Sequence, residues 1–132
     1  MTLVVDSSAV VAALVDDGPD GEWASAYLRS EPLAAPAHML IEVSNVLRRS
    51  VLADSVSRDV AALAHEVLPG IRVTTFGFPS LAARVWALHP TVTAYDAAYV
   101  ALAEELDVPL LTLDRRLVRA SGPTCVFLTP PE

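Results

Sequence analysis

The sequence predicts an α/β fold: a three-layer α/β/α domain around a mainly parallel central sheet of about four or five strands. Short apolar segments of strand character alternate with helical segments along the 132 residues, an order that places helices on both faces of a parallel sheet. Residues 110–113, Leu-Leu-Thr-Leu, form a continuous apolar run of the kind buried in such sheets. The length suits one core, so residues 1–132 are expected to form a single domain.

The first elements follow from apolar runs and turn residues. Residues 3–5 form the first strand, and Ser7 and Ser8 are good N-caps for a short buried helix over residues 9–15. Residues 16–21 are predicted to be a turn, because Asp, Gly and Pro dominate them.

The middle of the chain contains three helices and one short strand. A helix is predicted over residues 22–29, and residues 33–35, held between two prolines, form a strand near an edge of the sheet. Residues 37–51 carry apolar side chains at helical spacing along one stripe. A serine at 55 or 57 caps the next helix, which runs towards residue 68 and ends at a Pro-Gly pair.

The remaining elements continue the alternation. Residues 71–76 are rich in β-branched side chains and predict a strand, and a helix over about 81–88 stops at His-Pro. An alanine-rich helix over residues 97–106 packs closely on the sheet. After the strand at 110–113, a short basic helical turn covers residues 115–119, and residues 125–128 form the last strand.

Composition restricts the function classes. The formal net charge is −7, with nine arginines and no lysine, which argues against a general polyanion-coating surface. The absence of lysine also excludes receiver domains, which rely on a lysine at a later strand end. No apolar run reaches the roughly 18 residues of a membrane span and no secretory signal opens the chain, so a soluble, cytoplasmic protein without membrane contact is expected. The single cysteine, Cys125, is expected to be a small buried hydrophobe.

Four carboxylates lie at sequence positions that a parallel sheet brings together at one edge. Asp6 and Asp114 follow apolar strands, Asp96 lies in the first turn of a helix, and Glu42 flanks the apolar stripe of helix 37–51. Ligands of open α/β sheets bind beyond the carboxyl ends of the strands, so the four acids are expected to converge there. Two such charges about 4 Å apart repel by roughly 4 kcal/mol at an effective dielectric constant of about 20. Protonation of an acid relieves this repulsion in part, and a hard cation such as Mg²⁺ relieves it more completely.

Each acid also has a local explanation. Asp96 forms a variant of the capping box with Thr93, and Glu42 is placed to pair with Arg49. The four together favour a metal site. A cation held by carboxylates lowers the pKa of bound water and stabilises charge on a phosphoryl oxygen, so phosphodiester hydrolysis is the expected reaction.

Four blocks of the sequence resemble PIN domains, specifically the VapC-type toxins of bacterial toxin–antitoxin pairs. The blocks are VVDSSA from residue 4, EVSNVLRR from residue 42, YDAAYVALA from residue 95 and LTLDRRL from residue 111. They occur in the family's order and span nearly the whole chain. The resemblance implies a Mg²⁺- or Mn²⁺-dependent endoribonuclease that hydrolyses RNA, with its metal held by Asp6, Glu42, Asp96 and Asp114.

The resemblance also assigns roles within this site. Asp6 and Asp96 are the implied primary ligands, while Glu42 and Asp114 act directly or through water. Three polar side chains are implied to orient an aspartate or a water: Ser8, Asn45 and Thr112. Arg115 and Arg116 follow Asp114 directly in the chain and are candidate phosphate contacts, with solvated surface charge as the alternative.

Partners follow from the same resemblance. It implies a VapB-type antitoxin whose carboxy-terminal segment lies along a groove and blocks the acidic site, and it implies a homodimer. The aromatic residues Trp23, Tyr27 and Trp86 suit a docking surface, with packing in the core as the alternative.

Two other functions compete with this interpretation. A catalytically silent PIN-like binding module would use the acids only as helix caps and would act by pairing with a regulator. A Mg²⁺-dependent phosphatase would also use strand-end aspartates, but such enzymes usually carry an Asp-x-Asp motif or a lysine, and Asp6 is followed by Ser7 and Ser8.

Overall fold

The computed structural model describes residues 1–132. It contains one five-stranded sheet in the order β3-β2-β1-β4-β5, and all four strand pairs are parallel. The strands are β1 (Leu3–Val5), β2 (Leu33–Pro36), β3 (Val73–Phe76), β4 (Leu110–Leu111) and β5 (Phe127–Leu128). The predicted α/β class with a parallel sheet is therefore confirmed.

Seven α-helices and two short 3₁₀ helices connect the strands. The α-helices are α1 (Ser7–Val15), α2 (Pro19–Ser30), α3 (Met39–Leu52), α4 (Arg58–Val67), α5 (Ala82–Ala87), α6 (Ala94–Leu106) and α7 (Arg115–Arg119). The 3₁₀ helices are η1 (Leu68–Gly70) and η2 (Phe78–Ser80). None of the helices has the length and apolar composition needed to cross a membrane.

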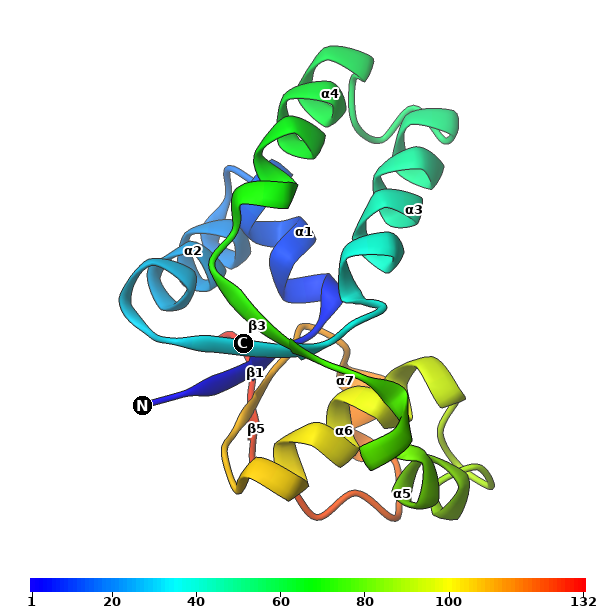
Figure 1. Ribbon diagram of the computed structural model, residues 1–132. Helices are drawn as coiled ribbons and strands as arrows, with labels where there is room; N and C mark the ends of the chain where they lie inside the picture. The colour runs from blue at the N-terminus through cyan, green and yellow to red at the C-terminus, as the bar shows by residue number, and fades with distance from the viewer.

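The helices form layers on both sides of the sheet, as Figure 1 shows: α1 to α4 lie on one side, and α5 and α6 lie on the other. A continuous cluster of 27 buried hydrophobic residues fills the space between the layers. Helix α6 is buried along its whole centre, from Ala97 to Ala103, because its alanines allow close approach to the strands. On the opposite face α1, which follows β1 in the chain, packs against α2 and α3.

The aromatic residues considered for docking have different surroundings. Trp23 and Tyr27 pack edge to face, with ring centroids 5.3 Å apart, and both lie half-buried against the core. Trp86 is 70% exposed and stacks on His89 at 4.2 Å.

Two local predictions were wrong. Helix α1 begins at Ser7, and its N-cap is Asp6, whose carboxylate accepts from the Ala9 N–H. Helix α2 begins at Pro19 within the predicted turn, because proline suits the first helical position. Strand β2 lies near an edge of the sheet, as predicted, next to the edge strand β3, and its prolines do not break the ladder because one precedes the strand and Pro36 ends it.

The centre of the sheet positions the site. Strand β1 lies between β2 and β4, and Val5 is in register with Leu111. The next residue of each strand therefore lies at the same carboxyl edge. The Asp6 N–H donates to the Leu111 carbonyl at 3.2 Å, which brings Asp6 beside Thr112.

Candidate metal centre

Asp6 is the buried centre of the acidic site. Its residue is 4% exposed, and both carboxylate oxygens accept hydrogen bonds. Oδ1 accepts from the Ser8 hydroxyl at 2.6 Å and from the Ala9 N–H at 3.1 Å. Oδ2 accepts from the fully buried Thr112 hydroxyl. Asp6 therefore has a single fixed orientation.

The two hydroxyls are themselves held by the backbone that follows β4. The Leu113 N–H donates to Ser8 Oγ at 2.9 Å, and the Asp114 N–H donates to Thr112 Oγ1 at 2.9 Å. Each hydroxyl therefore accepts from an N–H of the segment after β4 and donates to Asp6. Such outer hydrogen bonds orient metal-ligating carboxylates, and an orienting role for Ser8 and Thr112 stays a prediction.

Burial changes the protonation of Asp6. Removal from water raises the pKa of Asp6 from 3.8 to about 6, the three hydrogen bonds oppose this rise, and the charge of Asp96 adds to it. A group with this pKa loses its proton readily near neutral pH and then carries a charge in an almost dry environment. That charge needs a positive partner.

The other three acids are half-buried and lie at the start of helices. Asp96 lies in the first turn of α6, and the Thr93 hydroxyl caps that helix by accepting from the Asp96 N–H at 3.3 Å. Asp114 is the N-cap of α7, and its Oδ1 accepts from the Arg116 N–H at 3.0 Å. Glu42 lies in the first turn of α3.

Glu42 has a partner that the sequence did not suggest. The buried Tyr99 hydroxyl of α6 donates to Glu42 Oε1 at 2.8 Å, so Glu42 bonds across the site rather than pairing with Arg49 on its own helix. Burial, and then the charge of Glu42, raises the pKa of Tyr99. The tyrosine therefore stays protonated and acts as a permanent donor.

The four acids interact through their charges, with Asp96 at the centre of the group. The pKa of Asp96 is raised first by burial, then by the charges of Asp114 and Glu42, and Asp96 in turn raises the pKa of Asp6. As the side chains stand, no three of His, Cys, Asp and Glu lie close enough to hold one ion.

The chemistry of these donors nevertheless fits a hard divalent cation. All four are carboxylates, the oxygen donors that Mg²⁺ and Mn²⁺ prefer. Three of them, Asp6, Glu42 and Asp114, accept hydrogen bonds from hydroxyl or backbone N–H groups. Asp96, Asp114 and Arg116 also line one shallow pocket of about 240 Å³.

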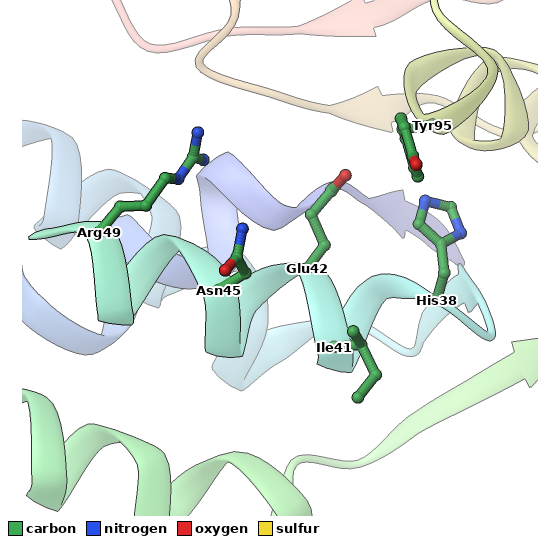
Figure 2. Close-up of a pocket in the computed structure, with 6 residues that line it drawn as sticks. All are labelled: His38, Ile41, Glu42, Asn45, Arg49 and Tyr95. Atoms are coloured by element: carbon green, nitrogen blue, oxygen red, sulfur yellow. The ribbon is translucent and has the colours of Figure 1, made fainter.

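The remaining three predicted residues lie in three different places. Arg116 is 91% exposed, and its Nε lies 4.0 Å from Asp114 Oδ1, beside the acids. Arg115 points to the chain end, where it donates to Thr129 Oγ1 at 3.2 Å and to the Pro130 carbonyl at 2.6 Å. Asn45 lines a groove of about 510 Å³ together with Glu42. Figure 2 shows both side chains rising from the same side of α3, whereas Ile41 points away.

Sequence reasoning missed the aromatic side of the site. The His38 ring lies 5.1 Å from the Tyr99 ring and 6.2 Å from the Tyr95 ring, measured between centroids. Tyr95 and Tyr99 occur at helical spacing beside Asp96, which was the only available signal. His38 lies 57 residues before Tyr95 in the chain, and no local pattern links them.

The fold and the acidic edge of the sheet define a class of protein. The family model for the PIN domain matches residues 3–123. Ribonuclease VapC1 of Mycobacterium tuberculosis is 42% identical over 123 residues, which cover 92% of both chains. The chain therefore belongs to the PIN-domain family, among its VapC members.

Solved structures of low sequence identity share the fold. The VapBC2 structure from Rickettsia felis, bound to a DNA fragment from its promoter, has a TM-score of 0.70 at 11% identity, covering 99% of this chain and 100% of that chain. VapC20 of Mycobacterium tuberculosis, described as a sarcin-ricin loop cleaving toxin, has a TM-score of 0.69 at 17% identity, covering 98% and 99%.

Proposed function

We propose that this chain is a VapC-type toxin, an endoribonuclease that hydrolyses RNA phosphodiester bonds with the aid of Mg²⁺ or Mn²⁺. The observation that carries the proposal is the buried, hydrogen-bonded Asp6 at the carboxyl edge of the central strands, with its charge facing that of Asp96. A silent binding module has no need for an acid whose ionisation is opposed by burial. The curated relatives bear the name ribonuclease.

The proposed metal ligands are Asp6 and Asp96, with Glu42 and Asp114 acting directly or through water. Asp6 is fixed by its hydrogen bonds, so gathering the donors requires rotation of the half-buried Asp96, Glu42 and Asp114 side chains, which is open to them at the surface. A divalent cation supplies stabilisation of charge on the phosphoryl oxygens and a lowered pKa of bound water.

The chain's own groups prepare the site for that chemistry. Ser8 and Thr112 keep the Asp6 oxygens turned to the sheet edge, and Tyr99 orients Glu42. Arg116 is free to contact a phosphate beside Asp114, and this exposed side chain is the stronger phosphate candidate. A phosphate contact by Arg115 requires release from the chain end and stays a prediction, as does an orienting role for Asn45.

Partners and location complete the proposal. VapC relatives have been solved in VapBC toxin–antitoxin structures. We propose a cognate VapB-type antitoxin for this chain, with a segment that lies along a groove and blocks the acidic site. A homodimer, a cytoplasmic location and a single domain over residues 1–132 are part of the same proposal.

The experiment is RNA cleavage by purified protein freed of any partner. We expect cleavage of single-stranded or looped RNA with Mg²⁺ or Mn²⁺, none in EDTA, and none by Asp6→Asn or Asp96→Asn at unchanged circular dichroism. Asp17→Asn changes an exposed acid beyond the C-terminal end of α1, the end opposite to Asp6; it is the matched control and should cleave normally. Equal cleavage by the wild type and both site variants would identify a contaminating nuclease and refute the proposal.

A further inference from the structure

Two open pockets meet at His38 and Tyr95. The first is the groove along α3 that contains Glu42 and Arg49 (Figure 2). The second has a volume of about 400 Å³ and is lined mainly by apolar side chains from the ends of β2 and β3 and the start of α6. Both pockets are lined by His38 and Tyr95. The groove that contains Glu42 therefore continues directly into an apolar pocket.

Exposed aromatic rings form part of the wall of this apolar pocket. Tyr95 is 68% exposed and Phe78 is 60% exposed, and Phe76 also lines the pocket. A protein surface rarely exposes two large aromatic side chains beside one pocket unless they take part in binding. Aromatic rings beside a groove of this kind are the usual platform for unstacked nucleobases.

The pocket wall also contains an unused polar atom. His38 Nε2 is buried and has no hydrogen-bond partner. Buried polar atoms are nearly always paired, so this nitrogen is expected to bond to a water molecule or to a polar group of a ligand in the pocket. A purely apolar side chain of a protein partner would leave it unpaired.

We propose that the apolar pocket binds one nucleobase of the RNA strand, next to the phosphate held at the acids. The base stacks against both Tyr95 and Phe78 and bonds to His38 Nε2, while the RNA backbone lies along the groove of α3 beside Arg49. The volume lies within the range of about 300–1,000 Å³ of small-molecule pockets. This proposal rests on the proposed function, because it names the part of the structure that binds the RNA substrate next to the cleavage site.

The first test measures RNA binding in the cleavage-inactive Asp96→Asn background. With a fluorescein-labelled single-stranded RNA, Tyr95→Ala and Phe78→Ala should each raise Kd about 5- to 150-fold, the range for loss of one base–aromatic stack. Trp86→Ala is the matched control, because that ring is equally exposed but lies on α5 and does not line the pocket. Its Kd should be unchanged. All three side chains are exposed, so thermal unfolding should be unaffected.

A second test identifies the base itself. RNAs that lack the base at one position in turn should show one position whose removal weakens binding as much as Tyr95→Ala, and the two losses should not add. His38→Phe keeps a ring and removes Nε2, so it should reduce the preference among the four bases at that position by up to about tenfold.

The outcomes separate the two proposals. Unchanged RNA binding in Tyr95→Ala and Phe78→Ala overturns the base pocket, including the case where these variants instead weaken binding of a protein partner. Normal cleavage with an unchanged KM in both variants, in the catalytically intact background, overturns the base pocket alone. If the wild-type protein neither binds nor cleaves RNA, the proposed function fails as well.

Discussion

Substitution of Asp6 by asparagine should stabilise the metal-free protein at neutral pH. The pKa of Asp6 is about 6 in the folded protein against an ordinary value of 3.8. At about 1.4 kcal/mol for each tenfold change in proton affinity, full ionisation of Asp6 lowers the free energy of unfolding by about 3 kcal/mol. Asparagine has the same shape and no charge, so Asp6→Asn removes this cost.

The sign of the pH dependence follows from the raised pKa. Below pH 3.8 the carboxyl is mostly protonated in both states, and its burial carries no ionisation cost. As the pH rises to and beyond about 6, ionisation is resisted only in the folded state, so the wild type loses stability relative to Asp6→Asn. About 2.5 kcal/mol of the change falls between about pH 4 and 7.5. The loss of one acceptor oxygen costs the variant about 1 kcal/mol at every pH.

The assay is urea unfolding in EDTA at several pH values, followed by tryptophan fluorescence, since Trp23 packs against the core. The quantity to compare is the variant's free energy of unfolding minus that of the wild type, which should rise by about 2.5 kcal/mol from about pH 4 to 7.5. Asp17→Asn should shift stability by less than about 0.5 kcal/mol. A difference for Asp6→Asn that does not vary with pH would refute the assignment of Asp6 as a buried, costly charge.

Three further changes test other parts of the structure. Thr112→Val removes the donor to Asp6 Oδ2 and should lower the cleavage rate about 10- to 100-fold. Thr112→Ser keeps the hydroxyl and should retain most of the activity. Equal activity of the two variants would contradict an orienting role for Thr112. Gly21→Ala places a Cβ 1.7 Å from the Asp16 carbonyl oxygen and should cost at least about 3 kcal/mol in thermal or urea unfolding. At Gly70 an added Cβ would meet no atom within 4 Å beyond the adjacent residues, so Gly70→Ala should change stability by less than about 0.5 kcal/mol. Similar losses in the two variants would refute the close packing of α1 and α2. Arg116→Gln should reduce the slope of log Kd against log salt by about 0.7 for single-stranded RNA, and an unchanged slope would exclude a phosphate contact.

Much of the fold is visible in the sequence because its signals are local. Strand β1, the stripe of α3 and the cap of α4 at Ser57 each depend on a few adjacent residues. The cap of α1 was misassigned because Asp6 and Ser8 are both good caps, and only the sheet decides between them. The Asp6 N–H is tied to Leu111 of β4, which holds Asp6 in the extended conformation that an N-cap requires.

The sequence indicated which acids could lie together, but it did not indicate which other side chains surround them. The carboxylates follow strand ends and helix starts, which the sequence marks. The hydrogen bond from Tyr99 to Glu42 joins residues 57 positions apart. The contact of His38 with Tyr95 depends on how the starts of α3 and α6 are placed relative to each other in the fold. Arg115 illustrates the same limit, because its orientation depends on where Thr129 and Pro130 lie after β5.

The central claim is that acids from distant segments share one divalent cation. The most direct measurement is anomalous diffraction from crystals of the protein soaked in Mn²⁺. We predict an anomalous peak between the carboxylates of Asp6 and Asp96, with Asp114 and Glu42 turned towards it, and no such peak in crystals of Asp96→Asn. Fully soaked crystals without a peak at this position, or with Mn²⁺ bound only elsewhere, would contradict the claim.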